Sequence, residues 1–503
     1  MAIREQQPRS KTQHMRLLPL LLLLLAATGC EDFLQREPLD QLTEGNFYKT
    51  FEDMDRATLA AYSPMQNIEW GGKGWMLTEV PSDNSEAGGT DPDFTPIDAF
   101  TVTADNGPVG LYWGIHYQQV AYANTVLDKA PGAELTAAQE AQLTAEARFL
   151  RAVAYFDLVR IYGGVPLLRT APSADTELFP ARATVAEVYE LIREDLSFAA
   201  DNLPLDAAQD GRATKGAALG VLAKVYLTRR DMDNARATAQ RVIDLGKYRL
   251  MDDFGENFLL ETSDNNAESI FQVQYTGCGP FGTGNANQAF FAPYGQGITK
   301  DRDGWGSQIP TGPTTVNPGT DIQRAYAEGD LRRYHTLMQP GDYYPMINPE
   351  DGGYTYPTNQ ISRSRANIKK YVIGGGPNVC FMSTPQNLHY LRYADILLTL
   401  AEAILERQGG TTTDPVALDA FNQVRLRAGL EPATEITRES MALERRREFA
   451  FEGHRWFDLL RTGRAIEVLT IHGKNIAEHN LLFPLPSAEL KINTNLVQNP
   501  GYN

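Results

Sequence analysis

The sequence predicts a mainly α-helical protein, built as a scaffold of paired helices with long irregular loops and a few short strands. Helical periodicity fills the regions of about 110–246 and 388–463. The regions of about 69–110 and 268–376 are instead rich in Gly, Pro, Asn, Asp and aromatic residues. Long loops inside a helical body are usually functional, so we expect these two regions to form a ligand-binding face.

The chain begins with the features of a bacterial lipoprotein signal peptide. Basic residues precede an apolar run at 17–27, which is shorter than the roughly 20 residues that cross a bilayer. Small residues follow, and the four residues ATGC that end at Cys30 resemble a lipobox. We therefore expect residues 1–29 to be removed and Cys30 to be lipidated, with a plain secretory signal as the alternative. The sequence leaves open whether translation begins at Met1 or Met15.

The composition narrows the chemistry of the mature protein. The 503 residues hold 46 Lys and Arg against 63 Asp and Glu, and such an acidic surface argues against nucleic acid as a partner. We expect residues 30–503 to form one domain. Only Cys278 and Cys380 remain after Cys30, and the sequence leaves open whether these two pair. No CxxC or Cys/His spacing indicates zinc, so we expect neither a metal nor a cofactor.

Four segments of the scaffold show the helical period: 141–163, 184–204, 214–246, and a segment that starts at His389. The segment 214–246 is expected to form two helices with a tight turn near Asp231. Small and aromatic residues in the last two segments follow the spacing of the tetratricopeptide repeat, in which small residues let paired helices approach closely. These positions are Leu222, Ala223, Tyr226 and Ala235 in the segment 214–246, and Leu400, Ala401 and Ile404 in the segment that starts at His389.

One short strand is expected in the loop regions, at 269–276 (SIFQVQYT). It is followed by GCGPFG at 277–282, which formally fits the GxGxxG pattern of dinucleotide sites. Such a site requires a helix to open directly afterwards, so that its N-terminus meets the pyrophosphate. The next residues, TGNANQAFFAPYGQG, are expected to be loop, and we therefore reject nucleotide binding.

Six segments together resemble the SusD/RagB family of outer-membrane nutrient-binding lipoproteins. They occur in the family's order nearly from end to end, which makes the resemblance far more specific than a single motif. The segments are CEDFLQREPLDQLTEGNFYKTFEDMDRATLAAY, the helix from Tyr112 to Asn124, EARFLRAVAYFDLVRIYGGVPLL, LRYADILLTLAEA, RRREFAFEGHRWFDLLRTG and LLFPLPSAELKINTNLVQNPGY.

This resemblance implies a SusD-like superhelix of tetratricopeptide-like pairs that carries an irregular ligand-binding face. It also implies a partner, a SusC-like TonB-dependent transporter over which such proteins act as a hinged lid. Glu31 and Asp32 after the lipidated cysteine look like the tag that places lipoproteins on the outer leaflet. The expected location is therefore the extracellular face of the outer membrane, with a lipid anchor.

No motif of the sequence indicates a catalytic site. The seven histidines are scattered, and neither HExxH nor a GxSxG nucleophile elbow occurs. A glycosidase needs only two carboxylates, so the sequence leaves that alternative open. The family resemblance implies a protein that binds without cutting.

The charge-rich segment from Arg445 to Gly463 is interpreted as scaffold. Glu444 is spaced to pair with Arg447, and Arg455 with Asp458, along a helix. Charge runs are usually paired or solvated faces. Arg392, Asp395 and Glu402 are interpreted in the same way.

Exposed aromatic rings that face the C–H surfaces of sugars, with polar side chains beside them, would bind a glycan. Trp113 and Trp456 lie in helical segments and are expected in the core, as buried Trp commonly anchors packing. The loop candidates compete with structural roles in loop packing or turns. They are Trp70, Trp75, Asp83, Asn84, Tyr294, Trp305, Tyr354 and Tyr356.

The function expected from the sequence is capture of an oligo- or polysaccharide at the cell surface and its delivery to the transporter. Three alternatives stay open: an oligopeptide ligand as in the RagB branch, a lipid-anchored glycoside hydrolase, and an adaptor that binds only proteins.

Overall fold

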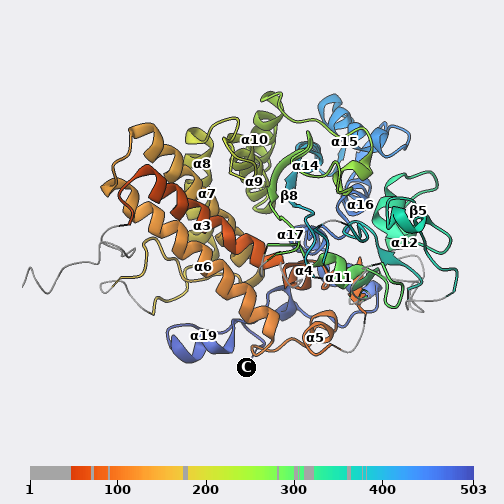
Figure 1. The fold of residues 1–503 in the computed structure, drawn as a ribbon, viewed down its shortest axis with the longest axis horizontal. Coiled ribbons are helices and arrows are strands. Elements are labelled where there is room, and N and C mark those ends of the chain that lie inside the picture. The colour runs from red at the N-terminus through yellow and green to blue at the C-terminus, as the bar shows by residue number, and fades with distance from the viewer. Residues whose placement is uncertain are drawn as a thin grey trace, which may run out of the picture.

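The computed structural model describes residues 47–69, 73–88, 91–173, 179–279, 283–298, 304, 306, 308–310, 322–359, 364–376, 378–380 and 382–502. Figure 1 shows packed helices on one side and a loop-rich part on the other, where α11, α12 and β5 lie. The expected signal peptide and Cys30 lie outside the described residues, so lipidation stays a prediction.

The helical part is a continuous series of packed neighbours. In order, α3 packs on α6, α6 on α7, α7 on α8, α8 on α9, α9 on α10, α10 on α14, and α14 on α15. The predicted mainly helical fold with paired helices is therefore confirmed. Their bounds are α3 Phe51–Glu69, α6 Gly107–Lys129, α7 Ala137–Tyr162, α8 Val185–Asn202, α9 Lys215–Thr228, α10 Met232–Asp244, α14 Tyr393–Arg407 and α15 Pro415–Arg427.

Local sequence signals set the ends of these helices. Thr136 and Thr184 each form a capping box. The threonine side chain accepts from a backbone N–H of the first turn, and the side chain of Gln139 or Glu187, respectively, accepts from the threonine N–H. The tight turn predicted near Asp231 is present, because Asp231 caps α10 directly after α9 ends.

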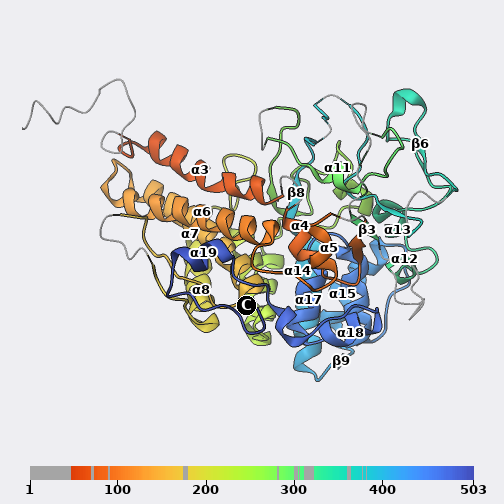
Figure 2. The same cartoon turned by 90° about the horizontal axis from the view of Figure 1, so that it is seen from below.

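The remaining helices are short, and most of them follow the last tetratricopeptide-like pair or interrupt the loops (Figure 2). Those near the C-terminus are α16 Arg438–Phe449, α17 Arg455–Arg461, α18 Ala465–Ile471 and α19 Ser487–Ile492. Those of the loop-rich part are α4 Lys73–Thr78, α5 Phe94–Asp98, α11 Asn287–Phe291, α12 Ile322–Ala325 and α13 Arg332–Thr336.

The strands form five separate antiparallel pairs among the described residues, and none of these pairs joins another. The strand predicted at 269–276 is confirmed as β2, which pairs with β8. The pairs are β1 Ser85–Ala87 with β3 Gln308–Pro310, β2 Ser269–Val273 with β8 Leu388–Arg392, β4 Leu337–Met338 with β7 Asn367–Ile368, β5 Tyr343–Tyr344 with β6 Tyr354–Thr355, and β9 Thr411–Thr412 with β10 Ile436–Thr437.

Two local predictions are wrong. The helix expected from His389 begins only at Tyr393, because residues 388–392 pair with β2 as a strand. The loop expected after 282 contains the short helix α11. In both cases a tertiary contact outweighs the local pattern: the partner strand β2 in the first, and the ring of Trp75 against Phe291 of α11 in the second.

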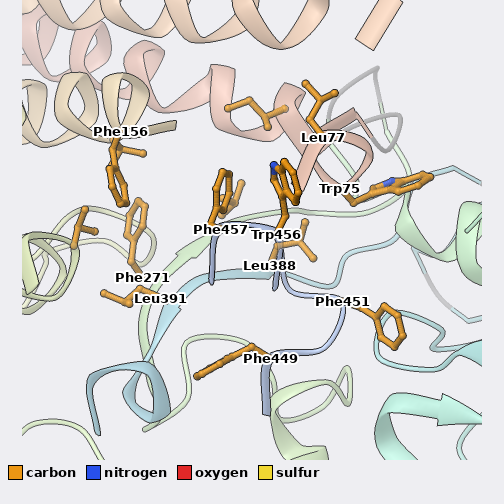
Figure 3. Packing of buried hydrophobic residues seen from close by; sticks show 14 of the residues in the cluster. Trp75, Leu77, Phe156, Phe271, Leu388, Leu391, Phe449, Phe451, Trp456 and Phe457 are labelled. Carbon is orange, nitrogen blue, oxygen red and sulfur yellow. The ribbon is translucent and has the colours of Figure 1, made fainter. Parts of the chain in front are cut away.

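A single large hydrophobic cluster runs through both parts of the molecule. It contains Phe156 of α7, Phe271 of β2, and Trp75 of the loop-rich part. Figure 3 shows Phe156 beside Phe271, with Trp456 lying toward Trp75. The expectation that Trp113 and Trp456 are core residues is confirmed, since both side chains are buried.

Cys278 and Cys380 form a disulfide, with their Cα atoms 5.4 Å apart. The bond joins the segment after β2 to the segment before β8. The same two segments also exchange backbone hydrogen bonds between Asn285 and Thr384. The question that the sequence leaves open is thus answered: the two cysteines pair.

Candidate functional site

The two loop regions expected to carry ligand meet in the structure. Strand β1, from the region of about 69–110, pairs antiparallel with β3, from the region of about 268–376, so that Glu86 lies opposite Ile309. Helix α4 packs against both regions, because its Trp75 contacts Phe94 of the first region and Phe290 of the second. The candidate site therefore brings together segments that are more than 200 residues apart in sequence.

Trp75 lies in the core, and the expectation that it is exposed in a loop is wrong. Its side chain is 5% exposed. The ring packs at 5.1 Å from Phe94, 5.5 Å from Phe290 and 5.3 Å from Phe291, measured between centroids. A ring covered on these sides has no free face for a sugar. Trp75 instead holds α11 against α4 and α5.

Asp83 and Asn84 are also buried, which contradicts their expected contact with ligand. Asp83 accepts from Arg455 at 2.7 Å and lies 3.2 Å from Arg446. Asn84 accepts from the Arg446 Nε at 2.8 Å and donates to Glu79 at 3.0 Å. Burial raises the pKa of Asp83, but the two guanidinium groups outweigh it and hold the pKa well below its usual value. These residues tie the loop to α16 and α17.

The three tyrosine candidates differ in exposure. Tyr356 is buried and donates to Asn367 Oδ1 at 2.8 Å, so its expected contact with ligand is contradicted. Tyr354 is partly buried, and its hydroxyl has no hydrogen-bond partner among the described residues. Burial raises the pKa of Tyr354 above its ordinary value, so this phenol stays neutral. Tyr294 is 70% exposed and therefore remains available to a ligand.

Tyr294 lies in a tight loop that directly follows α11. Gly306 donates its backbone N–H to the Ala292 carbonyl at 3.1 Å, which joins this loop to the segment around Trp305. A Cβ on Gly304 would lie 2.4 Å from the same carbonyl, so only glycine permits this approach. Both glycines flank Trp305 in the sequence. Trp305 itself, like Trp70, lies outside the described residues, and both stay predictions.

A hairpin of β5 and β6 borders the Tyr294 loop. Asn348, in the turn of this hairpin, donates to the Ile298 carbonyl at 3.2 Å and accepts from the Gly375 N–H at 2.6 Å. On the same hairpin Tyr343 and Met346 are both 50% exposed. Sequence reasoning missed these two residues. The signal was present, because the run GDYYPMINPEDGG surrounds them with turn-forming residues.

The charge-rich helices α16 and α17 are scaffold, as expected. Glu444, Arg445 and Glu448 are buried and paired. The expected partner of Arg455 is wrong, however. Arg455 forms its close ion pair with Asp83, 372 residues away in sequence, whereas Asp458 pairs with Arg445 and Arg461.

Among the described residues, no group of three His, Cys, Asp or Glu side chains is placed to hold a metal ion. Across the same part of the chain, no helix combines the length and the apolar character needed to cross a bilayer. The exposed side chains of this face include the rings of Tyr294 and Tyr343, and such rings can pack on the apolar surfaces of polar neutral molecules.

Two protein-family models match the chain. The model described as "SusD family" matches residues 261–502. The model described as "Starch-binding associating with outer membrane" matches residues 32–227. Together they cover both the helical part and the loop-rich part.

Curated relatives and solved structures are similar over most of the chain. A SusD-like protein of Bacteroides ovatus is 32% identical in an alignment of 461 positions that covers 87% of this chain and 80% of the relative. A solved laminarin-binding SusD-like protein has 29% identity and a TM-score of 0.75, covering 90% of this chain and all of that one. A structure solved with a xylogluco-oligosaccharide has 27% identity and a TM-score of 0.75, covering 87% and 97%.

Proposed function

Because the chain belongs to the SusD family, we propose that it is a cell-surface lipoprotein that binds a glycan and passes it to a SusC-like TonB-dependent transporter. One model that matches the chain describes a family associated with the outer membrane. The lipid anchor at Cys30, the extracellular face and the transporter partner are parts of the proposal.

The observation that carries the proposal is the similarity, over nearly the whole fold, to proteins that bind glycans. The laminarin-binding protein and the structure with a xylogluco-oligosaccharide each share more than a quarter of their aligned residues with this chain. Both cover the loop-rich part as well as the helices. A glycan is therefore the ligand class that the family relationship supports best.

The proposed binding surface is the Tyr294 loop together with its neighbours. Tyr294 presents an exposed ring beside the backbone of Ala292 and Gly306. We propose that Trp70 and Trp305 complete an arc of rings with it. Each ring would cover one C–H face of a sugar.

The disulfide between Cys278 and Cys380 supports a location outside the cytoplasm. Structural disulfides persist in oxidising compartments and are rare in the cytosol. The bond lies in the loop-rich part, next to the segment that leads into α11. A protein held outside the cell by a lipid would keep this bond, so the disulfide and the proposed Cys30 anchor agree.

We propose binding without catalysis. The buried carboxylates of α16 are held by arginines, with Glu448 bonded to Arg392 and Arg427. Those two guanidinium groups outweigh the effect of burial and keep the pKa of Glu448 far below its usual value, so it is no proton donor. An oligopeptide ligand is the second candidate, because amides and exposed rings also fit an extended backbone.

The test is binding of the mature protein to an array of neutral plant, algal and bacterial oligosaccharides. Tyr294→Ala is expected to weaken binding about tenfold, or about 1.4 kcal/mol, as an exposed ring at the centre of a site would. Tyr122→Ala is the matched control, because this tyrosine is also exposed but lies on α6 of the scaffold. The Tyr122→Ala variant should bind the oligosaccharide as tightly as the wild type does.

Three results would redirect the proposal. Binding of peptides but of no glycan would favour the oligopeptide alternative. Release of reducing sugar would favour a hydrolase. If this protein captures the transporter but binds no small ligand, the adaptor alternative would be favoured.

A further inference from the structure

The ammonium group of Lys474 lies among four oxygen atoms beside strand β1. Its Nζ donates to the carbonyls of Val80 at 3.0 Å, Ser82 at 2.8 Å and Ser85 at 3.4 Å. The fourth oxygen is Oδ1 of Asp98, at 2.8 Å. We call these four oxygens the Lys474 cage. The side chain of Lys474 is 10% exposed, so protein covers most of the cage.

The cage resembles the surroundings of a bound ion. Three of its carbonyls come from the short span 80–85, so their partial negative charges converge on one point. Buried polar groups of this kind are costly without a compensating partner. Backbone carbonyls of K⁺ channels replace the hydration shell of an ion in a comparable way. A Lys ammonium is likewise a compact point charge that is strongly hydrated in water, and in this cage the protein oxygens replace that water.

Asp98 connects the cage to β1. Its second carboxylate oxygen, Oδ2, accepts from the backbone N–H of Ala87 at 3.2 Å. Ser85 and Ala87 are the first and last residues of β1, so Lys474 and Asp98 together hold both ends of this strand. Without the ammonium, the carboxylate and the carbonyls would face one another with no cation between them. Their repulsion would displace the strand.

Strand β1 in turn holds the segment that meets the Tyr294 loop. It pairs antiparallel with β3 along its whole length. Two residues before β3 begins, Gly306 donates its backbone N–H to the Ala292 carbonyl at 3.1 Å. The exposed Tyr294 follows Ala292 by two positions. A displacement of β1 would therefore reach the loop that presents this ring.

The span 79–88 keeps other anchors when Lys474 is replaced, so the effect of a replacement should stay local. Asp83 accepts from Arg455 at 2.7 Å, and Asn84 accepts from Arg446 at 2.8 Å. These two bonds hold side chains. Lys474 instead holds backbone carbonyls, which set the path of the chain into β1.

We infer that Lys474 is a positioning residue of the candidate site: its ammonium acts as a built-in cation that sets the place of β1 and, through β3, of the Tyr294 loop. The inference deepens the proposed function and rests on it, because it takes β1 and the Tyr294 loop to be parts of a glycan site. It also predicts what can replace the side chain. n-Propylammonium contains the same heavy atoms that Lys474→Ala removes, so it should fill the vacated space and the cage.

The first test is hydrogen exchange measured by mass spectrometry on the full mature protein without any sugar. In Lys474→Ala, peptides covering 79–88 should exchange at least about tenfold faster than in the wild type, because lost hydrogen bonds to a charged group make local opening easier. n-Propylammonium chloride should restore slow exchange. Tetramethylammonium chloride at the same ionic strength should not, since this cation has no N–H donor.

The second test is affinity, with the tightest binder among laminaritriose, maltotriose and a xyloglucan heptasaccharide as the probe. Lys474→Ala should weaken binding about tenfold, since only molecules whose loop keeps its position bind the probe. n-Propylammonium should restore the affinity. A residue that only stabilises the fold would lower the midpoint of urea denaturation and leave the affinity of the folded protein unchanged.

Two further variants sharpen both tests. Lys474→Met keeps an apolar side chain in place of the ammonium, so it should show the fast exchange but no rescue by n-propylammonium. It also decides the question if Lys474→Ala fails to fold, as circular dichroism would show. Lys247→Ala is the matched control, because Lys247 also binds a carboxylate and a carbonyl, those of Asp206 and Leu205, but lies exposed in the helical part. It should behave as the wild type.

The inference is overturned if Lys474→Ala and Lys474→Met exchange at 79–88 as slowly as the wild type. It is also overturned if n-propylammonium and tetramethylammonium act alike on Lys474→Ala, or if a probe that binds the wild type binds this variant as tightly. If none of the three sugars binds the wild type, the proposed function loses its support, and the exchange at 79–88 still decides whether Lys474 positions β1.

Discussion

Asp83 shows how a single buried carboxylate anchors the loop of the candidate site. It is 2% exposed and lies between the guanidinium groups of Arg446 and Arg455. Removing one partner of a buried ion pair leaves the other charges uncompensated. Asp83→Ala is therefore expected to lower the free energy of unfolding by about 3 kcal/mol, measured by urea denaturation.

The matched control for Asp83 is Asp201→Ala, since Asp201 is exposed near the end of α8. A surface change of this kind should stay within about 0.5 kcal/mol of the wild type. Equal effects of the two substitutions would show that the ion pairs of Asp83 do not hold the loop.

His389 gives the protein a defined sensitivity to acid. It is partly buried, with Nε2 lying 3.2 Å from the Asn257 carbonyl and Nδ1 lying 3.3 Å from the Gln272 amide. Burial and the nearby Arg392 lower the pKa of His389 from 6.5 to about 4. Below pH 6.5 His389 is therefore protonated in the unfolded chain but stays neutral in the folded protein until the pH approaches 4. The stability from this group is lost as the pH falls from 6.5 toward 4.

His389→Gln keeps one donor and one acceptor but removes the titration. Between pH 7.5 and 5 the wild type should lose up to about 2 kcal/mol more than the variant, as the free energies of unfolding at each pH would show. The difference between the two proteins cancels the titration of the carboxylates that both share. Parallel stability curves would contradict the assignment.

Individual residues show which buried positions can be predicted from the sequence and which cannot. The core positions of Trp113 and Trp456 were predictable, because each lies in a segment with helical period. Trp75 was not, since the glycine-rich run GGKG precedes it and its partners Phe290 and Phe291 lie more than 200 residues away. The partners of Asp83 are still more distant in sequence, and no local pattern reveals them.

At the scale of elements, the disulfide stabilises the connections on both sides of the β2–β8 pair. It joins residues separated by 102 positions, and the N–H of Asn285 donates to Thr384 at 2.8 Å just before α11. The double variant Cys278→Ala with Cys380→Ala is expected to lower the free energy of unfolding by roughly 2–5 kcal/mol. Denaturant titration measures this change.

The same double variant should speed hydrogen exchange in peptides covering 276–285 and 378–384. Peptides of α7 provide the internal control, since this helix lies in the helical part and should exchange as before. An unchanged denaturation midpoint would show that the hydrogen bonds between these connections suffice without the covalent bond.

The elements also show why most of the scaffold was predictable. The helical period and the capping threonines act within a few residues, so α7 and α8 appear within a few positions of the expected 141–163 and 184–204. Strand β8 was missed because its sequence also fits a helix. Only its partner β2, more than 100 residues earlier, selects the extended conformation.

At the scale of the whole molecule, Arg392 joins three segments in the interior. Its side chain is 2% exposed and donates to Glu268 at 2.8 Å, to Glu448 at 2.5 Å and to Glu452 at 2.8 Å. Glu268 lies directly before β2, and Glu448 belongs to α16. The hydrophobic cluster also runs through both parts, so we expect the described body to unfold in one transition.

Circular dichroism reports on the helices, and tryptophan fluorescence reports on both parts, through Trp113 in α6 and Trp75 in α4. The two signals should therefore follow one denaturation curve. Arg392→Met removes one cation from a buried cluster in which Glu268 and Glu448 keep Arg427 and Glu452 keeps Lys370. It should shift both curves together, by about 3 kcal/mol. Arg407→Met is the control, because Arg407 pairs with Asp233 on the surface, where such pairs contribute about 0–1 kcal/mol. Two separate transitions in the wild type, or a shift of one signal alone in Arg392→Met, would mean that the loop-rich part folds independently of the helices.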